Sequence, residues 1–247
     1  VGRAIRLLFF MLVHFSVVKA QQSFVWESIR HGKYLQAISM IDSLSATDNY
    51  EILELNAHAL YRSYQVEAYH QAIRNVYKAD NDKIRAEILL SLKTADYYQL
   101  VLRSDSTIYF AHQGMRLFRE RGGYLPDSLR CYIYFSYANN VRNWRGPNEH
   151  LGKRWPQAER NTYLRAYLDT AMQFAVNDEQ RADIYMILGT LHTDGLTRYE
   201  HERSQEYVEC SARSIFYLQK AIELLLTPTR IAHAYALIGL NHNYMFE

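Results

Sequence analysis

Two ten-residue stretches that lie 50 residues apart share one pattern: DIYMILGTLH at 183–192 and HAYALIGLNH at 233–242. In each, a tyrosine is followed three residues later by an aliphatic residue, then by glycine, and three residues after that by histidine. Steps of three and four residues place these side chains on one face of a helix, and a glycine on that face lets a second helix approach closely. The stretches therefore predict two equivalent helices in a repeated array.

Further apolar helical faces recur along the chain at intervals that favour repeated helix pairs. Comparable positions, 35, 39, 53 and 50 residues apart, are Ala37, Ala72, Ala111, Leu164 and Ser214. The two shorter intervals approximate a 34-residue helix–turn–helix unit, and the two longer ones fit that unit with an insertion. Only 4 prolines and 10 glycines occur in 247 residues, which argues against the many tight turns of a β-sandwich or barrel. The predicted fold class is all-α, an α-α superhelix of antiparallel helix pairs.

The pattern resembles the tetratricopeptide repeat (TPR) family, which has an aromatic residue, an aliphatic residue, a glycine or alanine and a large residue at the four positions described. The histidines depart from the tyrosine of that pattern, and the unit lengths are irregular, so another all-α array or bundle is the alternative. The resemblance implies a solenoid whose first helices line a concave face that binds an extended peptide. The positions that contact ligand in the family correspond here to Asp183, Met186, Thr190, Thr193, His233, Ala236, Leu240 and Asn243. They do not reproduce the Lys/Asn pair that some members use for a peptide's terminal carboxylate.

Residues 1–20 have the features of a secretory signal peptide. Arg3 and Arg6 precede an apolar run at 7–18, and Ala20 supplies the small residue before the expected cleavage. The alternative is an uncleaved membrane anchor, which would be the chain's only contact with a membrane, but twelve helical residues span about 18 Å, short of a hydrocarbon core of about 30 Å. We therefore expect a bacterial protein exported to the periplasm or cell envelope. Its repeat domain would cover 21–247, with insertions near 145–160 and 194–203.

The charge balance shows no excess of basic residues of the kind that binds nucleic acid. The chain has 28 Lys+Arg against 26 Asp+Glu. Removing Arg3, Arg6 and Lys19 with the signal leaves 25 against 26, which is near neutral. The two cysteines, Cys131 and Cys210, are too few for a disulfide scaffold or a cysteine-rich zinc module. They would form one disulfide or remain two buried thiols.

The sequence contains no recognisable catalytic or cofactor motif. It has no HExxH, phosphate-binding glycine loop, dinucleotide fingerprint or GxSxG elbow. The side chains of Glu200, His201 and Glu202 would face different directions on a helix, so they could not bind one metal ion together. His192 occupies a packing position of the repeat. We therefore expect no enzyme activity, no cofactor and no metal site.

The two insertions predict a second binding surface, because both leave the same edge of a helix-pair array. This loop rim combines the residue types that dominate interaction hot spots. Its members are Trp144, Arg145, Arg154, Trp155, Tyr199 and Arg203.

The expected function is that of an exported scaffold that binds protein or peptide partners without catalysis. One alternative is the N-terminal sensing region of a larger protein, such as a protease, a sensor kinase or a regulator. Another is an envelope glycan-binding protein or enzyme on a helical scaffold. In that case tyrosines would line a groove for sugars, although most of them are expected in the core; they are Tyr97, Tyr98, Tyr132, Tyr134 and Tyr137.

Overall fold

The computed structural model describes residues 23–43, 50–142, 147–148, 153–154, 157–196 and 205–246, without side chains at 147–158, 193–207 and 243–246. Within these ranges every regular element is a helix apart from two strands of two residues each. The described residues form two compact units, divided between Ala79 and Asp80. The expected signal peptide lies outside the described residues and stays a prediction.

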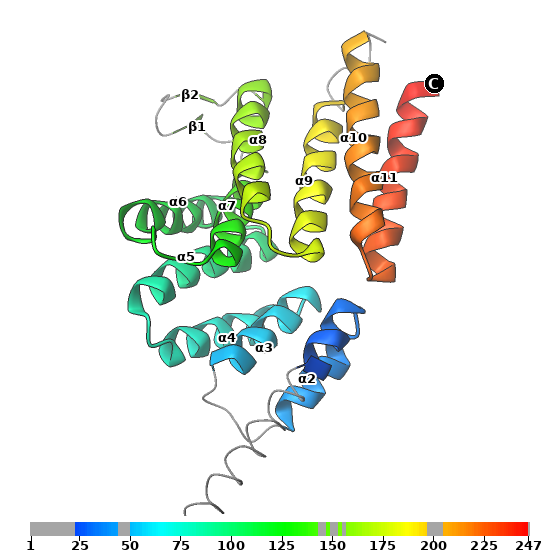
Figure 1. Cartoon of the computed structure of the whole chain (residues 1–247). Coiled ribbons are helices and arrows are strands. Elements are labelled where there is room, and N and C mark those ends of the chain that lie inside the picture. The colour runs from blue at the N-terminus through cyan, green and yellow to red at the C-terminus, as the bar shows by residue number, and fades with distance from the viewer. Residues whose placement is uncertain are drawn as a thin grey trace, which may run out of the picture. The chain divides into compact units, whose positions relative to one another are not determined.

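The first unit consists of a helical segment at 23–30 followed by α2 (Tyr34–Asp42), α3 (Tyr50–Arg62) and α4 (Val66–Ala79) (Figure 1). Helix α3 contacts both α2 and α4. The apolar faces that the periodicity predicts meet in one core, formed by Val25, Ile29, Ala37, Ile41, Ile52 and Ala59.

The second unit contains seven helices among its described residues: α5 (Lys83–Leu100), α6 (Ser104–Arg121), α7 (Asp127–Arg142), α8 (Gln157–Gln173), α9 (Asp178–Leu196), α10 (Gln205–Leu224) and α11 (Pro228–Phe246). Between α7 and α8, β1 (Pro147–Asn148) pairs antiparallel with β2 (Lys153–Arg154). Each helix packs against the next in the chain. In addition, α7 contacts α5, α9 contacts α7 and α11 contacts α9, so the first helices of the pairs α5–α6, α7–α8 and α9–α10 follow one another and α11 comes next (Figure 1). This packing is compatible with the predicted helical repeat.

Apolar periodicity predicts helices at 34–45, 50–64, 67–79, 82–100, 105–120, 126–143, 160–176, 179–193, 204–226 and 229–245, and the bounds of α2 to α11 lie within three residues of these ranges. Two helices extend into the expected insertions. Helix α8 begins at Gln157, directly after Pro156, because Gln, Ala and Glu in its first turn favour helix. Helix α9 continues through Gly195 to Leu196, since an isolated glycine lowers helix stability without ending the helix.

Three turns between the helices of a pair share one geometry. Gly32, Tyr64 and Leu102 have φ of 74°, 57° and 57°, in the left-handed region. The next residue in each turn donates its backbone N–H five residues back, to Ser28, Leu60 and Tyr98, at 2.8–3.0 Å. These are the bonds of a Schellman motif, which normally ends in glycine. The turns at Tyr64 and Leu102 could not be predicted from sequence, because the sequence signal for such a turn is glycine.

The glycine shared by the two decisive stretches has the predicted packing role in α9. A Cβ placed on Gly189 would lie 2.7 Å from Cγ of Leu218 in α10, so only glycine fits. A Cβ placed on Gly114 of α6 would likewise lie 2.7 Å from Cγ of Leu92 in α5. Helix pairs α5–α6 and α9–α10 therefore approach through equivalent glycine–leucine contacts.

No disulfide joins Cys131 to Cys210, so the alternative of one disulfide is wrong. Cys131 is buried in the core of the second unit, whereas Cys210 is half-buried in α10. Burial, followed by the charge of Asp183, raises the pKa of the Cys131 thiol to about 12. At neutral pH this side chain is therefore a small apolar group.

Candidate functional site

The expected peptide-binding positions in α9 are largely used for contacts between helices. Asp183 pairs with Arg230 of α11. The hydroxyl of Thr190 accepts a hydrogen bond from Arg142 of α7 at 2.5 Å. Met186 is only 9% exposed and packs with Leu218 and other residues of α10 and α11. These side chains hold α7, α9, α10 and α11 together, and they leave little open surface on α9.

The equivalent positions of α11 lie on the surface. His233, Ala236 and Leu240 are exposed, Leu240 by 39%. Thr193 and Asn243 fall within α9 and α11, but their side chains lie outside the described residues. Of the expected peptide-binding residues, those with most exposed surface in the described part therefore belong to α11.

The loop rim falls almost wholly outside the described residues. Only the backbone of Arg154 is placed, in β2 opposite Pro147. Trp144, Arg145, Trp155, Tyr199 and Arg203 are not described. The rim therefore stays a prediction.

The tyrosines considered for a sugar groove do not lie together on the surface. Tyr137 is 1% exposed, and its hydroxyl hydrogen-bonds with His112 and Tyr163 at 3.2 Å each. Tyr134 stacks against Phe174, with ring centroids 6.0 Å apart. Tyr97 and Tyr98 contact each other, and Tyr98 stacks on Phe110. Tyr134 and Tyr137 thus join α7 to neighbouring helices, and Tyr98 joins α5 to α6.

A buried polar cluster that the sequence analysis missed joins α5 to α7. The carboxylate of Asp96 in α5 accepts hydrogen bonds from three residues on one face of α7: Asn140 at 2.6 Å, Tyr132 at 3.0 Å and Ser136 at 3.3 Å. Asp96 is 7% exposed, and desolvation raises its pKa despite these donors and the charge of Lys93. The spacing of 132, 136 and 140 was the only signal in the sequence, and nothing pointed to Asp96 as its partner.

A small cavity of about 70 Å³ lies beside this cluster. It is lined by the end of α5, the start of α6 and Asn140, whose amide oxygen has no hydrogen-bond partner among protein atoms. A volume of this size holds an ordered water and is too small for a peptide. The hydrogen bonds of the cluster therefore fix α5 against α7, and the cavity beside it is not a peptide-binding groove.

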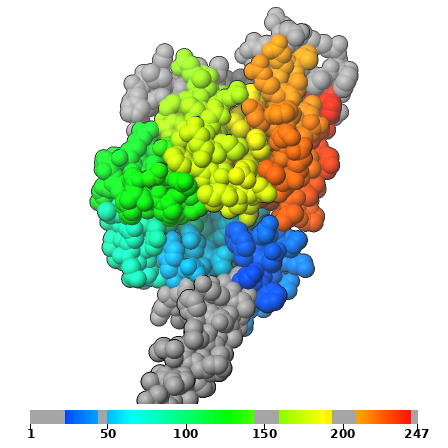
Figure 2. All heavy atoms as spheres, viewed as in Figure 1, coloured from blue at the N-terminus to red at the C-terminus, as the bar shows by residue number. Residues whose placement is uncertain are grey.

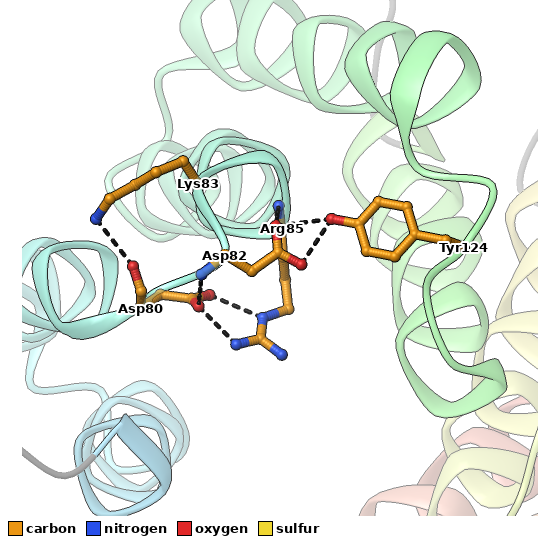
Figure 3. A network of polar contacts seen from close by, with 5 residues as sticks. All are labelled: Asp80, Asp82, Lys83, Arg85 and Tyr124. Carbon is orange, nitrogen blue, oxygen red and sulfur yellow. Dashed lines mark hydrogen bonds and ion pairs between the residues drawn. The ribbon is translucent and has the colours of Figure 1, made fainter.

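A second polar network fixes the start of α5 (Figure 3). The carboxylate of Asp80, 1% exposed, accepts two hydrogen bonds from the Arg85 guanidinium, at 2.5 and 2.8 Å. Asp82 caps α5 by accepting from the Arg85 backbone N–H at 3.1 Å. The Tyr124 hydroxyl, from the connection between α6 and α7, donates to the Asp82 carboxylate and lowers the pKa of that group. The carboxylates of Asp80 and Asp82 are thus hydrogen-bonded to groups of the chain itself, which indicates a structural role.

His192 has the packing role that its repeat position predicts. Its ring lies nearly parallel to that of Tyr217 in α10, with centroids 5.8 Å apart. Burial, followed by the charges of Arg165 and Arg213, lowers the pKa of His192 to about 4. The ring is therefore neutral at pH 7.

In the part of the chain that the structure describes, no group of three or more His, Cys, Asp or Glu side chains is arranged to hold a metal ion. None of the described helices is both long and apolar enough to cross a membrane.

No family model, curated protein or solved structure matches this chain.

Proposed function

We propose that this protein is an exported helical-repeat scaffold that binds protein or peptide partners and catalyses no reaction. The observation that carries the proposal is the serial contact of α5, α7 and α9, the first helices of the pairs α5–α6, α7–α8 and α9–α10, with α11 packed next to α9. Successive pairs packed in this way expose an extended surface on which a chain of residues can bind.

The polar groups inside the second unit also support a scaffold. The carboxylates of Asp96, Asp80 and Asp82 have their hydrogen bonds satisfied by neighbouring helices or turns. Such groups hold helices in a fixed arrangement and are not poised for proton transfer to a substrate. The binding surface would include His233 and Leu240 of α11, with the loop rim as a second contact region.

A charge-matched pair of variants tests the peptide-binding surface. Peptides selected for binding from a random display library would be measured by fluorescence anisotropy against His233→Glu and against Gln219→Glu. Both positions are exposed, but Gln219 lies on α10, outside the proposed surface. We expect His233→Glu to weaken binding at least about tenfold. Gln219→Glu should change it by less than about twofold.

Failure to select any peptide, or equal effects of the two variants, would contradict the proposed surface. The loop rim is tested separately with Arg154→Ala/Trp155→Ala, whose unaltered binding to a purified partner would remove the rim from the proposal. Export is tested by expressing the chain in bacteria and sequencing the mature N-terminus, which we expect at Gln21.

A further inference from the structure

Helices α9 and α11 carry the same residues at matched positions but differ in what covers them. In α9, a Cβ placed on Gly189 would meet Leu218 at 2.7 Å. In α11, a Cβ placed on Gly239 meets nothing within 4 Å. The glycine that admits a neighbouring helix in α9 therefore faces open space in α11.

The surrounding residues show the same contrast. Ala182, Met186 and Gly189 of α9 are all buried. The residues 50 positions later, Ala232, Ala236 and Gly239, are all exposed. Tyr235, the counterpart of the half-buried Tyr185, is 59% exposed. We call Ala232, Tyr235, Ala236 and Gly239 the α11 face.

The helix that covers α9 shows which chemistry fits such a face. Leu218 of α10 lies on Gly189, and the Ser214 hydroxyl donates a hydrogen bond to the Gly189 carbonyl at 2.9 Å. Between them, Tyr217 stacks on Tyr185 with ring centroids 6.2 Å apart, and on His192. Figure 2 shows α10 packed along α9, with α11 at the edge of the same unit. A small polar residue followed four residues later by leucine is thus the complement of the Tyr–Gly–His pattern.

The lack of charged residues on α11 and the burial of α10 against α9 both restrict which helix can bind the α11 face. Residues 231–242 contain no Asp, Glu, Lys or Arg, so a helix bound there needs an uncharged contact face. A second folded copy cannot supply α10, because its Ser214 and Leu218 are both 0% exposed against its own α9. Leu92, which makes the other glycine–leucine contact of the described residues, is likewise 0% exposed.

We propose that the α11 face docks an amphipathic α-helix of a partner protein, which places a leucine on Gly239 and a serine or alanine one turn before it. The docked helix continues the α9–α10 packing by one step. This inference rests on the proposed binding function and names one of its surfaces and the chemistry of the ligand. It uses Gly239, whereas the peptide test above uses His233, so each can fail without the other.

The probe is a synthetic peptide with the α10 sequence, residues 205–226 with Cys210→Ser, titrated into the whole chain and followed by fluorescence anisotropy. We expect saturable binding by this peptide and none by the same peptide carrying Leu218→Asp. In the chain, Gly239→Ala should weaken binding at least about tenfold, because its methyl group occupies the place of the leucine. Gly123→Ala, also open at Cβ, is the matched control and should leave binding unchanged.

Thermal unfolding of the Gly239→Ala variant shows whether weaker peptide binding comes from the loss of the docking contact or from unfolding of the chain. Since Gly239 is unobstructed, Gly239→Ala should raise Tm by about 2–4 °C through its better helix propensity, even as it weakens docking. Absence of saturable α10-peptide binding, or binding that Gly239→Ala leaves undiminished, overturns the proposal. So does a dimer in sedimentation equilibrium that Gly239→Ala dissociates, which would identify a second copy as the occupant. Protection of 232–239 from hydrogen exchange in partner-free protein from its native source would identify a segment of its own chain instead.

Discussion

Asp96 in α5 and Asn140 in α7 are joined by a 2.6 Å hydrogen bond, although 44 residues separate them in sequence. Asp96 also accepts bonds from Tyr132 and Ser136, so one buried carboxylate holds three turns of α7. The arrangement fixes how the helix pairs α5–α6 and α7–α8 meet. It also places a titratable group where its charge is costly.

The stability of the chain should depend on the protonation of Asp96. Its folded pKa is raised, so the folded state binds this proton more tightly than the unfolded state does. The stabilisation that results is present below the unfolded pKa of about 4 and is lost as pH rises through the folded pKa. Urea unfolding at several pH values should show a decline in wild-type stability over this window, and Asp96→Asn should reduce that decline. An identical pH dependence in the two proteins would contradict the prediction.

The control for that comparison is Asp96→Ala. This change leaves the amide of Asn140 and the hydroxyls of Tyr132 and Ser136 without their shared acceptor, in a buried site. We expect it to lower the free energy of unfolding by about 3 kcal/mol, considerably more than Asp96→Asn does.

His192 should destabilise the fold on acidification. Its folded pKa of about 4 lies below the unfolded value, so stability is present above about pH 6.5 and is lost as pH falls towards 4. Between pH 7 and pH 5 we expect a loss of about 1 kcal/mol from this group, after discounting for its partial exposure to solvent. His192→Phe keeps an aromatic ring beside Tyr217 and cannot titrate, so it should lack this component. Denaturation curves of both proteins at pH 5 and 7 measure the difference.

Two buried serines of α10 should respond in opposite directions to alanine. The Ser211 hydroxyl has no hydrogen-bond partner, so Ser211→Ala should raise stability by up to about 1 kcal/mol. The Ser214 hydroxyl donates to Gly189 and accepts from Asn241 at 3.0 Å, so Ser214→Ala should cost about 1–2 kcal/mol. Urea midpoints at unchanged m-value would report both effects. A loss of equal size in the two variants would show that hydrogen bonding does not distinguish these sites.

Leu102 should be replaceable by glycine with a gain in stability. It is 88% exposed and has a left-handed backbone, which costs a residue with a side chain about 1–2 kcal/mol. We expect Leu102→Gly to raise the free energy of unfolding by about 1 kcal/mol, net of the greater freedom of glycine in the unfolded chain. Arg116→Gly, at an exposed position within α6, is the control and should lower it by about 1 kcal/mol. Destabilisation by both changes would show that the turn carries no such strain.

The helices of this protein are determined locally, and the sequence predicts them well. Apolar residues at steps of three and four mark one face of a helix wherever they occur, and Pro228 lies at the first position of α11. The repeated Tyr–Gly–His pattern likewise predicts the close contact between α9 and α10. Each of these signals lies within one helix or its ends, and so it can be read without knowing which helices are neighbours.

The tertiary structure alone decides what covers those helices. Gly189 and Gly239 occupy the same sequence pattern, yet a Cβ placed on Gly189 would meet Leu218 of the next helix, whereas a Cβ placed on Gly239 would meet nothing within 4 Å beyond its own helix backbone. Met186 was expected on an open face and is buried, while Asp96 finds its three partners on a helix more than thirty residues away. The physical reason is that helix periodicity arises from hydrogen bonds four residues apart, whereas burial and polar pairing depend on which surfaces meet after the helices pack.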